Sequence, residues 1–169
     1  MKKILAIAMS LLFLGACSKD KNNNNNNNGP TGLTGRLVGT WNMTDLGYST
    51  QVPNPLNPLS PIDLTGDAQD LEGTFTVTAN PNVVVYNYSF NIVDADLPFP
   101  IPVQRSGQAT WDVISNDTKV VLEENGESTI YDVITNEAAR QVWAGTLPFT
   151  IPGVGITVDS DIQFTLERQ

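Results

Sequence analysis

Apolar and polar residues alternate along most of the chain after residue 36, and helical periodicity is nearly absent. The clearest case is residues 156–166, where Ile156, Val158, Ile162 and Phe164 share one phase and mainly polar residues fill the other. Such alternation is typical of strands with one buried and one solvated face. The pattern predicts eight strands, at residues 37–46, 72–79, 83–93, 104–115, 118–124, 128–134, 140–146 and 156–166.

Turn signals separate these segments, and the strongest is Asn125-Gly126, a dipeptide that favours two-residue hairpins. Eight sequential antiparallel strands with one apolar face suit an up-and-down barrel, because a closed barrel leaves no sheet edge exposed. A two-sheet β-sandwich is the alternative. We therefore expect an all-β domain at residues 36–169, built as an eight-stranded antiparallel up-and-down barrel or as a sandwich.

Gly39-Thr40-Trp41, in the first predicted strand, marks one end of the expected barrel. A glycine has no Cβ, so Gly39 lets another segment cross close to the backbone. The Trp41 indole is large enough to plug the end of a closed sheet. The alternative is that Trp41 is simply a core aromatic residue on an edge strand.

Three apolar, proline-rich stretches interrupt the alternation, at residues 52–62, 97–103 and 147–153. Proline lacks the amide hydrogen that a β-ladder needs, so these stretches are predicted to be connections rather than central strands. They belong to the predicted connections 47–71, 94–103 and 147–155. If the strands alternate in direction, all three connections fall at the barrel end opposite Trp41.

At that end we predict the rim of an open mouth. Phe99 and Phe149 are expected beside the rim, and Tyr88, Phe90 and Ile92 on the wall just below it. An apolar rim with a few polar groups fits a ligand entrance, and exposed apolar patches usually mark a contact surface. The alternative is that the same stretches fold over the end and seal it as additional core.

Residues 1–16 combine the features of a bacterial export signal. A Lys-Lys pair precedes an apolar run that is too short to span a bilayer, and small residues lead into Cys17, the sole cysteine. This arrangement resembles the lipobox of bacterial lipoproteins, which implies removal of the signal peptide and acylation of Cys17. Two or three acyl chains make such an attachment stable. An ordinary secretory signal and a buried core helix are the alternatives.

Residues 17–35 follow as a polar tether that contains seven consecutive asparagines. Almost no apolar residue is present to offset the entropy of ordering, so a disordered tether is predicted. No aspartate directly follows Cys17, which argues against inner-membrane retention by resemblance to lipoprotein sorting rules. We expect a lipid-anchored outer-membrane protein, on either the periplasmic face or the cell surface.

The composition excludes several functions. Loss of the signal peptide removes two of nine basic residues, which leaves 18 acidic residues against 7 basic ones and changes the formal charge from −9 to −11. Such an acidic protein repels phosphate backbones, so nucleic acid is not an expected partner. Histidine is absent and Cys17 is assigned to the lipid, which excludes histidine-based triads, thiolate chemistry and His or Cys metal sites. Acidic pairs such as Asp94 and Asp96 are interpreted as solvated charges, with a weak Ca²⁺ site or a glycosidase pair as the alternatives, so we expect no enzyme activity, metal or cofactor.

The lipobox, the polar tether and Leu37-Val38-Gly39-Thr40-Trp41 at the start of about eight strands resemble the lipocalin-like lipoproteins common in Bacteroidota. The resemblance implies a barrel that binds a small ligand, and it implies that Arg168 of the last strand packs on Trp41. With eight strands of alternating direction, the first strand starts at the barrel end where the eighth strand finishes. The same two residues are therefore expected to meet there. The usual lipocalin disulfide has no counterpart here.

Two functional hypotheses follow. In the first, a membrane-anchored lipoprotein binds a small apolar or amphipathic ligand at the open end of the barrel. In the second, the protein is a non-catalytic interaction subunit of an envelope or cell-surface complex and docks on a protein partner through its proline-rich stretches.

The substitution Cys17→Ser is expected to abolish membrane attachment and to leave the precursor uncleaved at the lipoprotein site, because the acyl group has no other acceptor. Membrane fractionation and the mass of the product measure both effects, with Ser18→Ala as a control that keeps the acceptor. Normal recovery of the Cys17→Ser variant in the outer membrane would contradict the lipoprotein assignment.

Overall fold

The computed structural model describes residues 32–54, 59–95, 97, 99–151 and 155–169. The signal peptide, Cys17 and the tether as far as residue 31 lie outside the described residues, as do parts of the three proline-rich stretches. The described elements are α1 (Leu33–Leu37), β1 (Gly39–Val52), β2 (Ile62–Asp67), β3 (Gln69–Thr78), β4 (Val83–Ile92), β5 (Ile101–Ile114), β6 (Lys119–Glu124), β7 (Glu127–Asn136), β8 (Arg140–Ile151) and β9 (Ile156–Arg168).

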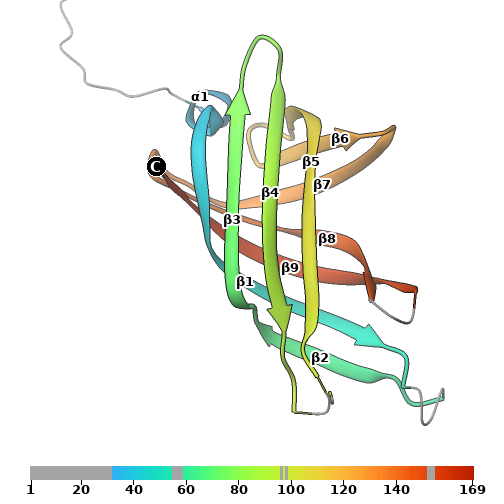
Figure 1. The fold of residues 1–169 in the computed structure, drawn as a ribbon. Coiled ribbons are helices and arrows are strands. Elements are labelled where there is room, and N and C mark those ends of the chain that lie inside the picture. The colour runs from blue at the N-terminus through green and yellow to red at the C-terminus, as the bar shows by residue number, and fades with distance from the viewer. Residues whose placement is uncertain (1–31, 55–58, 96, 98, 152–154) are drawn as a thin grey trace, which may run out of the picture.

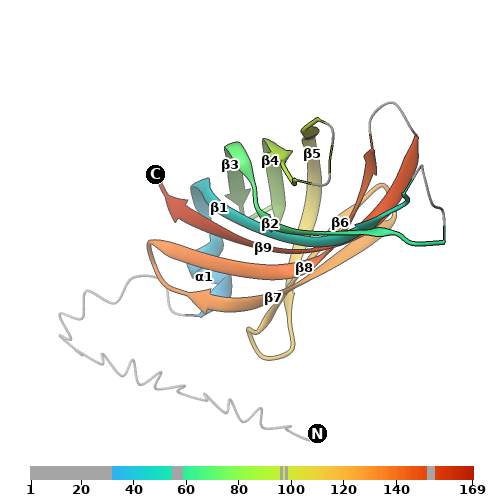
Figure 2. The same ribbon diagram turned by 90° about the horizontal axis from the view of Figure 1, so that it is seen from below.

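The strands form one closed, antiparallel barrel (Figure 1). Their order is β2-β1-β3-β4-β5-β6-β7-β8-β9, and an added pairing of β1 with β9 closes the sheet. Strands β1 and β3 to β9 make the eight-stranded barrel, and β2 is an extra strand beside β1. Figure 2 shows the sheet curving around its interior, which holds the buried apolar side chains. The predicted all-β barrel is therefore confirmed, in preference to the sandwich.

The predicted connection at residues 47–71 is wrong in most of its length. Strand β1 continues as far as Val52, and β2 returns along it in register from Gly47↔Asp67 to Val52↔Ile62. The alternation in fact persists beyond residue 46, because Tyr48, Thr50 and Val52 are buried. The edge of β1 is thus shared, with its first residues paired to β3 and its last residues paired to β2.

Two prolines that were expected in connections lie within strands. Pro102 of β5 is opposite Asn91, and Pro148 of β8 is opposite Asp159. Pairing of β5 with β6 begins only at Thr110, and pairing of β8 with β7 ends at Gly145. Each proline therefore lies where its strand has one partner, so its missing amide hydrogen need not interrupt a ladder.

The barrel end that contains Trp41 is closed by the short helix α1. Its residues Leu33 and Leu37 are completely or almost completely buried in the core. The Asp117 carboxylate accepts a hydrogen bond from the Leu33 backbone amide at 3.1 Å. Leu33 therefore packs with the barrel although the boundary predicted at residue 36 placed it in the tether, because both leucines of α1 are available to cover the barrel end.

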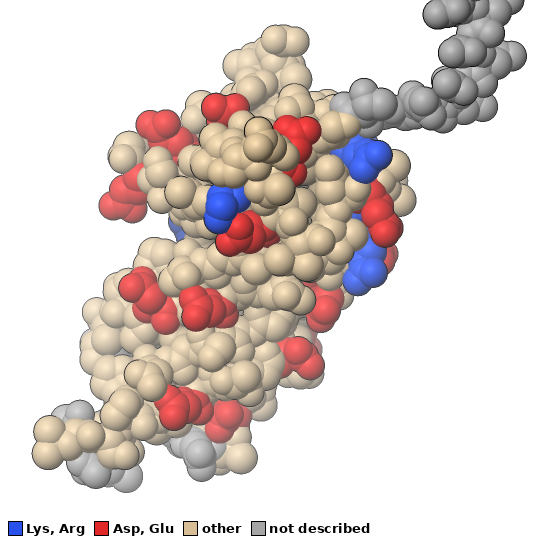
Figure 3. Space-filling model, turned by 180° about the vertical axis from the view of Figure 1, so that it is seen from behind, with Lys and Arg blue, Asp and Glu red and all other residues tan. Residues whose placement is uncertain are grey.

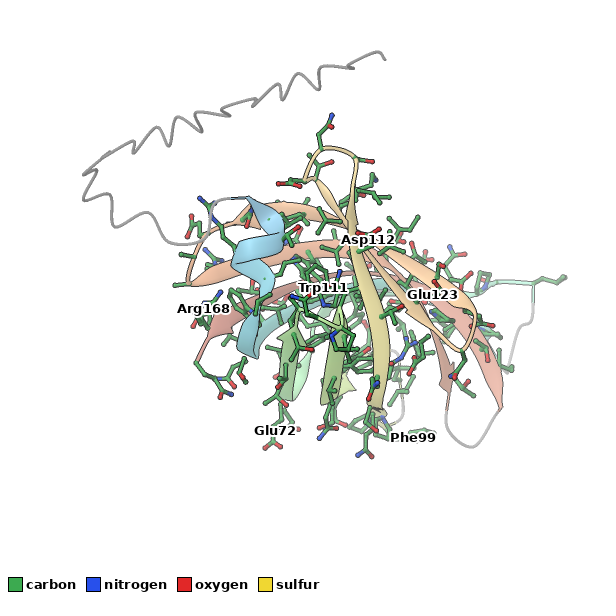
Figure 4. All side chains as sticks on the ribbon, turned by 90° about the horizontal axis from the view of Figure 1, so that it is seen from above. Glu72, Phe99, Trp111, Asp112, Glu123 and Arg168 are labelled. Carbon is green, nitrogen blue, oxygen red and sulfur yellow. The ribbon has the colours of Figure 1, made fainter. Side chains whose placement is uncertain are left out.

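Arg168, the last residue of β9, joins this helix to the barrel (Figure 4). Its guanidinium carbon lies 4.3 Å from the centroid of the Trp41 ring, and its Nη1 and Nη2 donate to the carbonyls of Val38 and Arg36 at 2.9 and 2.6 Å. The Trp41 indole donates to the Leu37 carbonyl at 2.8 Å. These donors satisfy carbonyl groups that the end of a helix leaves without intrahelical partners.

Gly39 is a point of close approach between two segments. Its φ of +145° is one that L residues with a side chain rarely adopt, and a Cβ at this position would collide with the Arg168 guanidinium. The segment that passes close to the Gly39 backbone is therefore the arginine side chain itself.

Trp41→Ala is expected to lower the free energy of unfolding by about 3–5 kcal/mol, because the indole is 1% exposed and the substitution leaves a cavity beneath Arg168. Urea denaturation measures the change. Val85→Ala on β4, where the side chain is 50% exposed, is the control and should cost far less. An unchanged unfolding midpoint for Trp41→Ala would show that the indole does not hold this end together.

Candidate ligand-binding cavity

A cavity of about 590 Å³ lies inside the barrel. Its lining includes Pro102, Asn125 and Thr150, which belong to the strand ends and turns opposite α1. The apolar part of the lining consists mainly of Met43, Leu46, Phe75, Phe90, Ile92, Ala109, Leu122, Leu147, Phe149, Ile162 and Phe164. Most of these side chains are buried from solvent, so the cavity is an apolar chamber with an entrance at one end.

The entrance follows from the short hairpin of β6 and β7. Residues of β5 before Thr110 pair only with β4, and residues of β8 after Gly145 pair only with β9. Side chains from both of these half-paired segments line the cavity, together with Glu124, Asn125 and Glu127 at the hairpin tip. The mouth therefore lies where the hairpin is too short to cover the space between β5 and β8.

The residues predicted for this site have different positions in the structure. Tyr88, Phe90, Ile92 and Phe149 line the cavity. Phe99 does not line it, and its side chain is 65% exposed at the edge of the molecule (Figure 4). The reason is that β5 begins only at Ile101, so Phe99 remains in the preceding connection.

The three proline-rich stretches also differ in what they contribute. The second supplies Pro102 and Val103 to the lining, and the third supplies Leu147, Pro148, Phe149 and Thr150. None of the described residues of the first stretch lines the cavity. Two stretches thus form the rim from within strands, and they leave the chamber unfilled.

An aromatic wall forms one side of the cavity. Tyr86, Tyr88 and Phe90 alternate along β4, and Phe75 of β3 stacks on Tyr88 with centroids 6.0 Å apart and planes 7° apart. Phe164 of β9 also stacks on Phe75, with the ring centroids 5.9 Å apart. Stacked rings of this kind present a large apolar surface with little conformational freedom.

A charged pair lies at the edge of this wall. Nη2 of Arg105 is 3.6 Å from Oε2 of Glu124, and the Tyr86 hydroxyl donates to the same oxygen at 2.6 Å. The Arg105 guanidinium carbon is also 5.9 Å from the centroid of the Tyr86 ring. At Gly107 an added Cβ would collide with Glu124 and with the Tyr86 hydroxyl, so this glycine allows the two side chains to meet.

The sequence prediction missed Arg105 and Glu124, although the alternation contains the signal. Arg105 and Gly107 share the inward phase of Ala109 and Trp111 in β5. Glu124 shares the phase of Val120 and Leu122 in β6. A charged residue in an apolar phase is the pattern that indicates an inward-facing charge, and two such residues occur on neighbouring strands.

The tyrosines of the cavity remain neutral at neutral pH. Burial raises the pKa of Tyr88 to about 12, and burial also raises the pKa of Tyr131. The pKa of Tyr86 is raised by burial and by its hydrogen bond to Glu124. Neutral hydroxyls both donate and accept hydrogen bonds, so they add hydrogen-bonding groups to the cavity without adding charge.

Acidic residues elsewhere are scattered over the surface, as Figure 3 shows for one face. Asp161, for example, accepts a hydrogen bond from Thr146 at 2.7 Å on the outside of the barrel. Within the described part of the chain, no three acidic side chains gather closely enough to hold a metal ion. No helix among the described residues has the length and apolar character needed to cross a membrane.

Comparison with models of known protein families, with curated proteins and with solved structures finds no match to this chain. The likeness to lipocalin-like lipoproteins therefore rests on the sequence pattern. The barrel itself is established by strand order and register.

The free energy of unfolding is expected to fall as the pH rises from about 10 to 12. Because burial raises the pKa of Tyr88 in the folded state to about 12, the unfolded chain loses this proton first, and stability present below pH 10 is lost above it. The contribution of Tyr88 is on the order of 2 kcal/mol. Urea denaturation across this pH range measures it.

Tyr88→Phe is the matched variant for this effect, because it removes the ionisable hydroxyl and keeps the ring that stacks on Phe75. It should flatten part of the decline, with the remainder due to Tyr48, Tyr86 and Tyr131, whose pKa values burial also raises. An identical pH dependence in the variant and the parent protein would show that Tyr88 ionises as freely as an exposed tyrosine.

Proposed function

We propose that the protein is a membrane-anchored lipoprotein that binds a small apolar or amphipathic ligand in the barrel cavity. The observation that carries this proposal is the unfilled chamber of about 590 Å³ with an aromatic wall and a polar edge. Ligand sites typically occupy roughly 300–1,000 Å³, are mostly apolar, and contain a few polar groups that orient the ligand. Side chains normally fill a protein interior to close-packed density, so a chamber that they leave open supports a role in binding.

The position of the chain entry agrees with an anchored protein. The described chain enters the barrel through α1 at the closed end, and the mouth lies at the opposite end. An acyl group on Cys17, placed in the outer membrane as the lipobox implies, would join the domain from the side away from the mouth. The mouth is then accessible to ligands from the solvent.

Exposed apolar residues in two proline-rich connections favour a second function, that of an interaction subunit. The side chains of Leu59 and Phe99 are 95% and 65% exposed, and both lie in proline-rich connections. Exposed apolar groups of this size often belong to contact surfaces. Crosslinking from these positions in cells tests this function, and Phe99→Ala should weaken partner capture without altering the cavity.

Thr129→Trp is expected to weaken ligand binding about tenfold or more, which corresponds to about 1.4 kcal/mol, because Thr129 lines the cavity and an indole there occupies ligand volume. Titration with a fluorescent hydrophobic dye, followed by displacement with fatty acids and acylglycerols, measures the affinity. The matched control is Ser128→Trp, which adds the same side chain at the exposed neighbouring position of β7. Failure of the parent protein to bind any of these compounds would contradict the proposed function.

A further inference from the structure

We infer that the cavity mouth selects an uncharged amphiphile whose head group both donates and accepts hydrogen bonds, such as a hydroxyl- or amide-bearing lipid. This inference rests on the proposed function and deepens it, since it states the chemical class of the head group. It derives from the pairing of Arg105 with Glu124 at the mouth and from the apolar chamber beneath that pair.

The ion pair is accessible from the mouth, and its hydrogen-bonding capacity is not used up. The side chains of Arg105 and Glu124 are 34% and 26% exposed, so both can be reached by an entering ligand. Their 3.6 Å separation is longer than the roughly 2.7–2.9 Å of a charge-assisted hydrogen bond. The guanidinium has five N–H donors and the carboxylate has lone pairs beyond the one that Tyr86 uses, so both retain capacity.

The charges at the mouth disfavour an anionic head group. In the cavity lining Arg105 is the one basic residue among the described residues, and it is accompanied by Glu124 and Glu127. A carboxylate that binds Arg105 must compete with Glu124 and approach Glu127 as well. The acidic surface of the domain adds to this repulsion (Figure 3).

A cationic head group meets the opposite difficulty. It would be attracted to the two glutamates, but Arg105 lies beside Glu124 on the path into the chamber. Displacement of either partner leaves the other charge half-buried without its counterion, which is costly. A simple ion of either sign therefore breaks an interaction that the mouth already contains.

A neutral head group avoids both costs. A hydroxyl or amide can accept from N–H groups of Arg105 that the ion pair does not use and donate to Glu124, while the ion pair stays intact. The lining also includes the Tyr88 and Tyr131 rings, whose hydroxyls stay neutral, and the Thr129 hydroxyl. The apolar chain then extends toward Phe75, Leu122 and Phe164. The ligand is thus oriented with its head at the mouth.

Three probes with the same apolar chain test the selection: 1-dodecanoylglycerol, dodecanoate and dodecyltrimethylammonium, each below its micellar concentration. Displacement of a hydrophobic dye gives the three affinities. We expect the acylglycerol to bind at least about tenfold more tightly than either ion. This ranking in the parent protein decides the inference even if a variant fails to fold.

The variant Glu124→Gln sharpens the test, because it removes the competing carboxylate and keeps an acceptor for Tyr86. It should raise dodecanoate affinity about tenfold and so reduce or remove the preference for the acylglycerol over dodecanoate. The matched control is Glu123→Gln, the same charge change at the adjacent exposed residue, which does not line the cavity (Figure 4). It should change dodecanoate affinity only slightly.

Dodecanoate binding that equals or exceeds acylglycerol binding and is lost in Arg105→Gln would overturn the inference and identify Arg105 as an anion receptor. Equal binding of all three probes would overturn it too, because the affinity would then not depend on the head group. In both cases the proposed ligand binding survives. Absence of dye and probe binding in the parent protein would instead overturn both the inference and the proposed function.

Discussion

The pairing of the first strand with the last is the constraint on which the rest of the structure depends. Without the contact between β1 and β9 the sheet would have two open edges, and no interior would be enclosed. The register includes Trp41 opposite Arg168, and the arginine side chain continues the connection by donating to backbone carbonyls of Arg36 and Val38 at the end of α1. The same set of interactions therefore closes both the sheet and the barrel end. Since no disulfide can form with a single cysteine, this closure has to come from packing and hydrogen bonds.

The two ends of the barrel differ because of strand length. At the α1 end, helix and indole fill the space, and Leu33, Leu37 and Trp41 are almost completely buried. At the other end β1, β5, β8 and β9 extend beyond the hairpin of β6 and β7, whose strands turn back at Asn125-Gly126. The longer strands continue the wall, but the hairpin does not reach across it. One end is consequently closed, and the other has a mouth.

Much of this fold could be predicted from the sequence, because strand alternation and turn chemistry are local signals. All eight predicted barrel strands are present, and the Asn125-Gly126 hairpin connects β6 and β7 as expected. The contact of Trp41 with Arg168 could be predicted from strand parity alone. Strand β2 and the strand positions of Pro102 and Pro148 could not, because a proline is acceptable wherever a strand lacks its second partner, and partner number is a property of the whole sheet. Of the residues predicted for the candidate site, Phe90 and Phe149 line the cavity and Phe99 does not.

The region around Arg105 departs from what stability alone would favour. An unfilled chamber gives up packing contacts that apolar side chains could supply. A partly buried ion pair adds little stability and can often be replaced by apolar residues at no cost. Gly107 adds a further cost, since glycine within a strand loses conformational entropy and supplies no side chain for packing. These three features occur at one place, and Gly107 is required there only because Tyr86 and Glu124 meet above it. Local exceptions that concentrate at one site are expected where a site serves binding rather than folding. The charged edge and the unfilled chamber therefore support the proposed ligand site, of which they would be two parts.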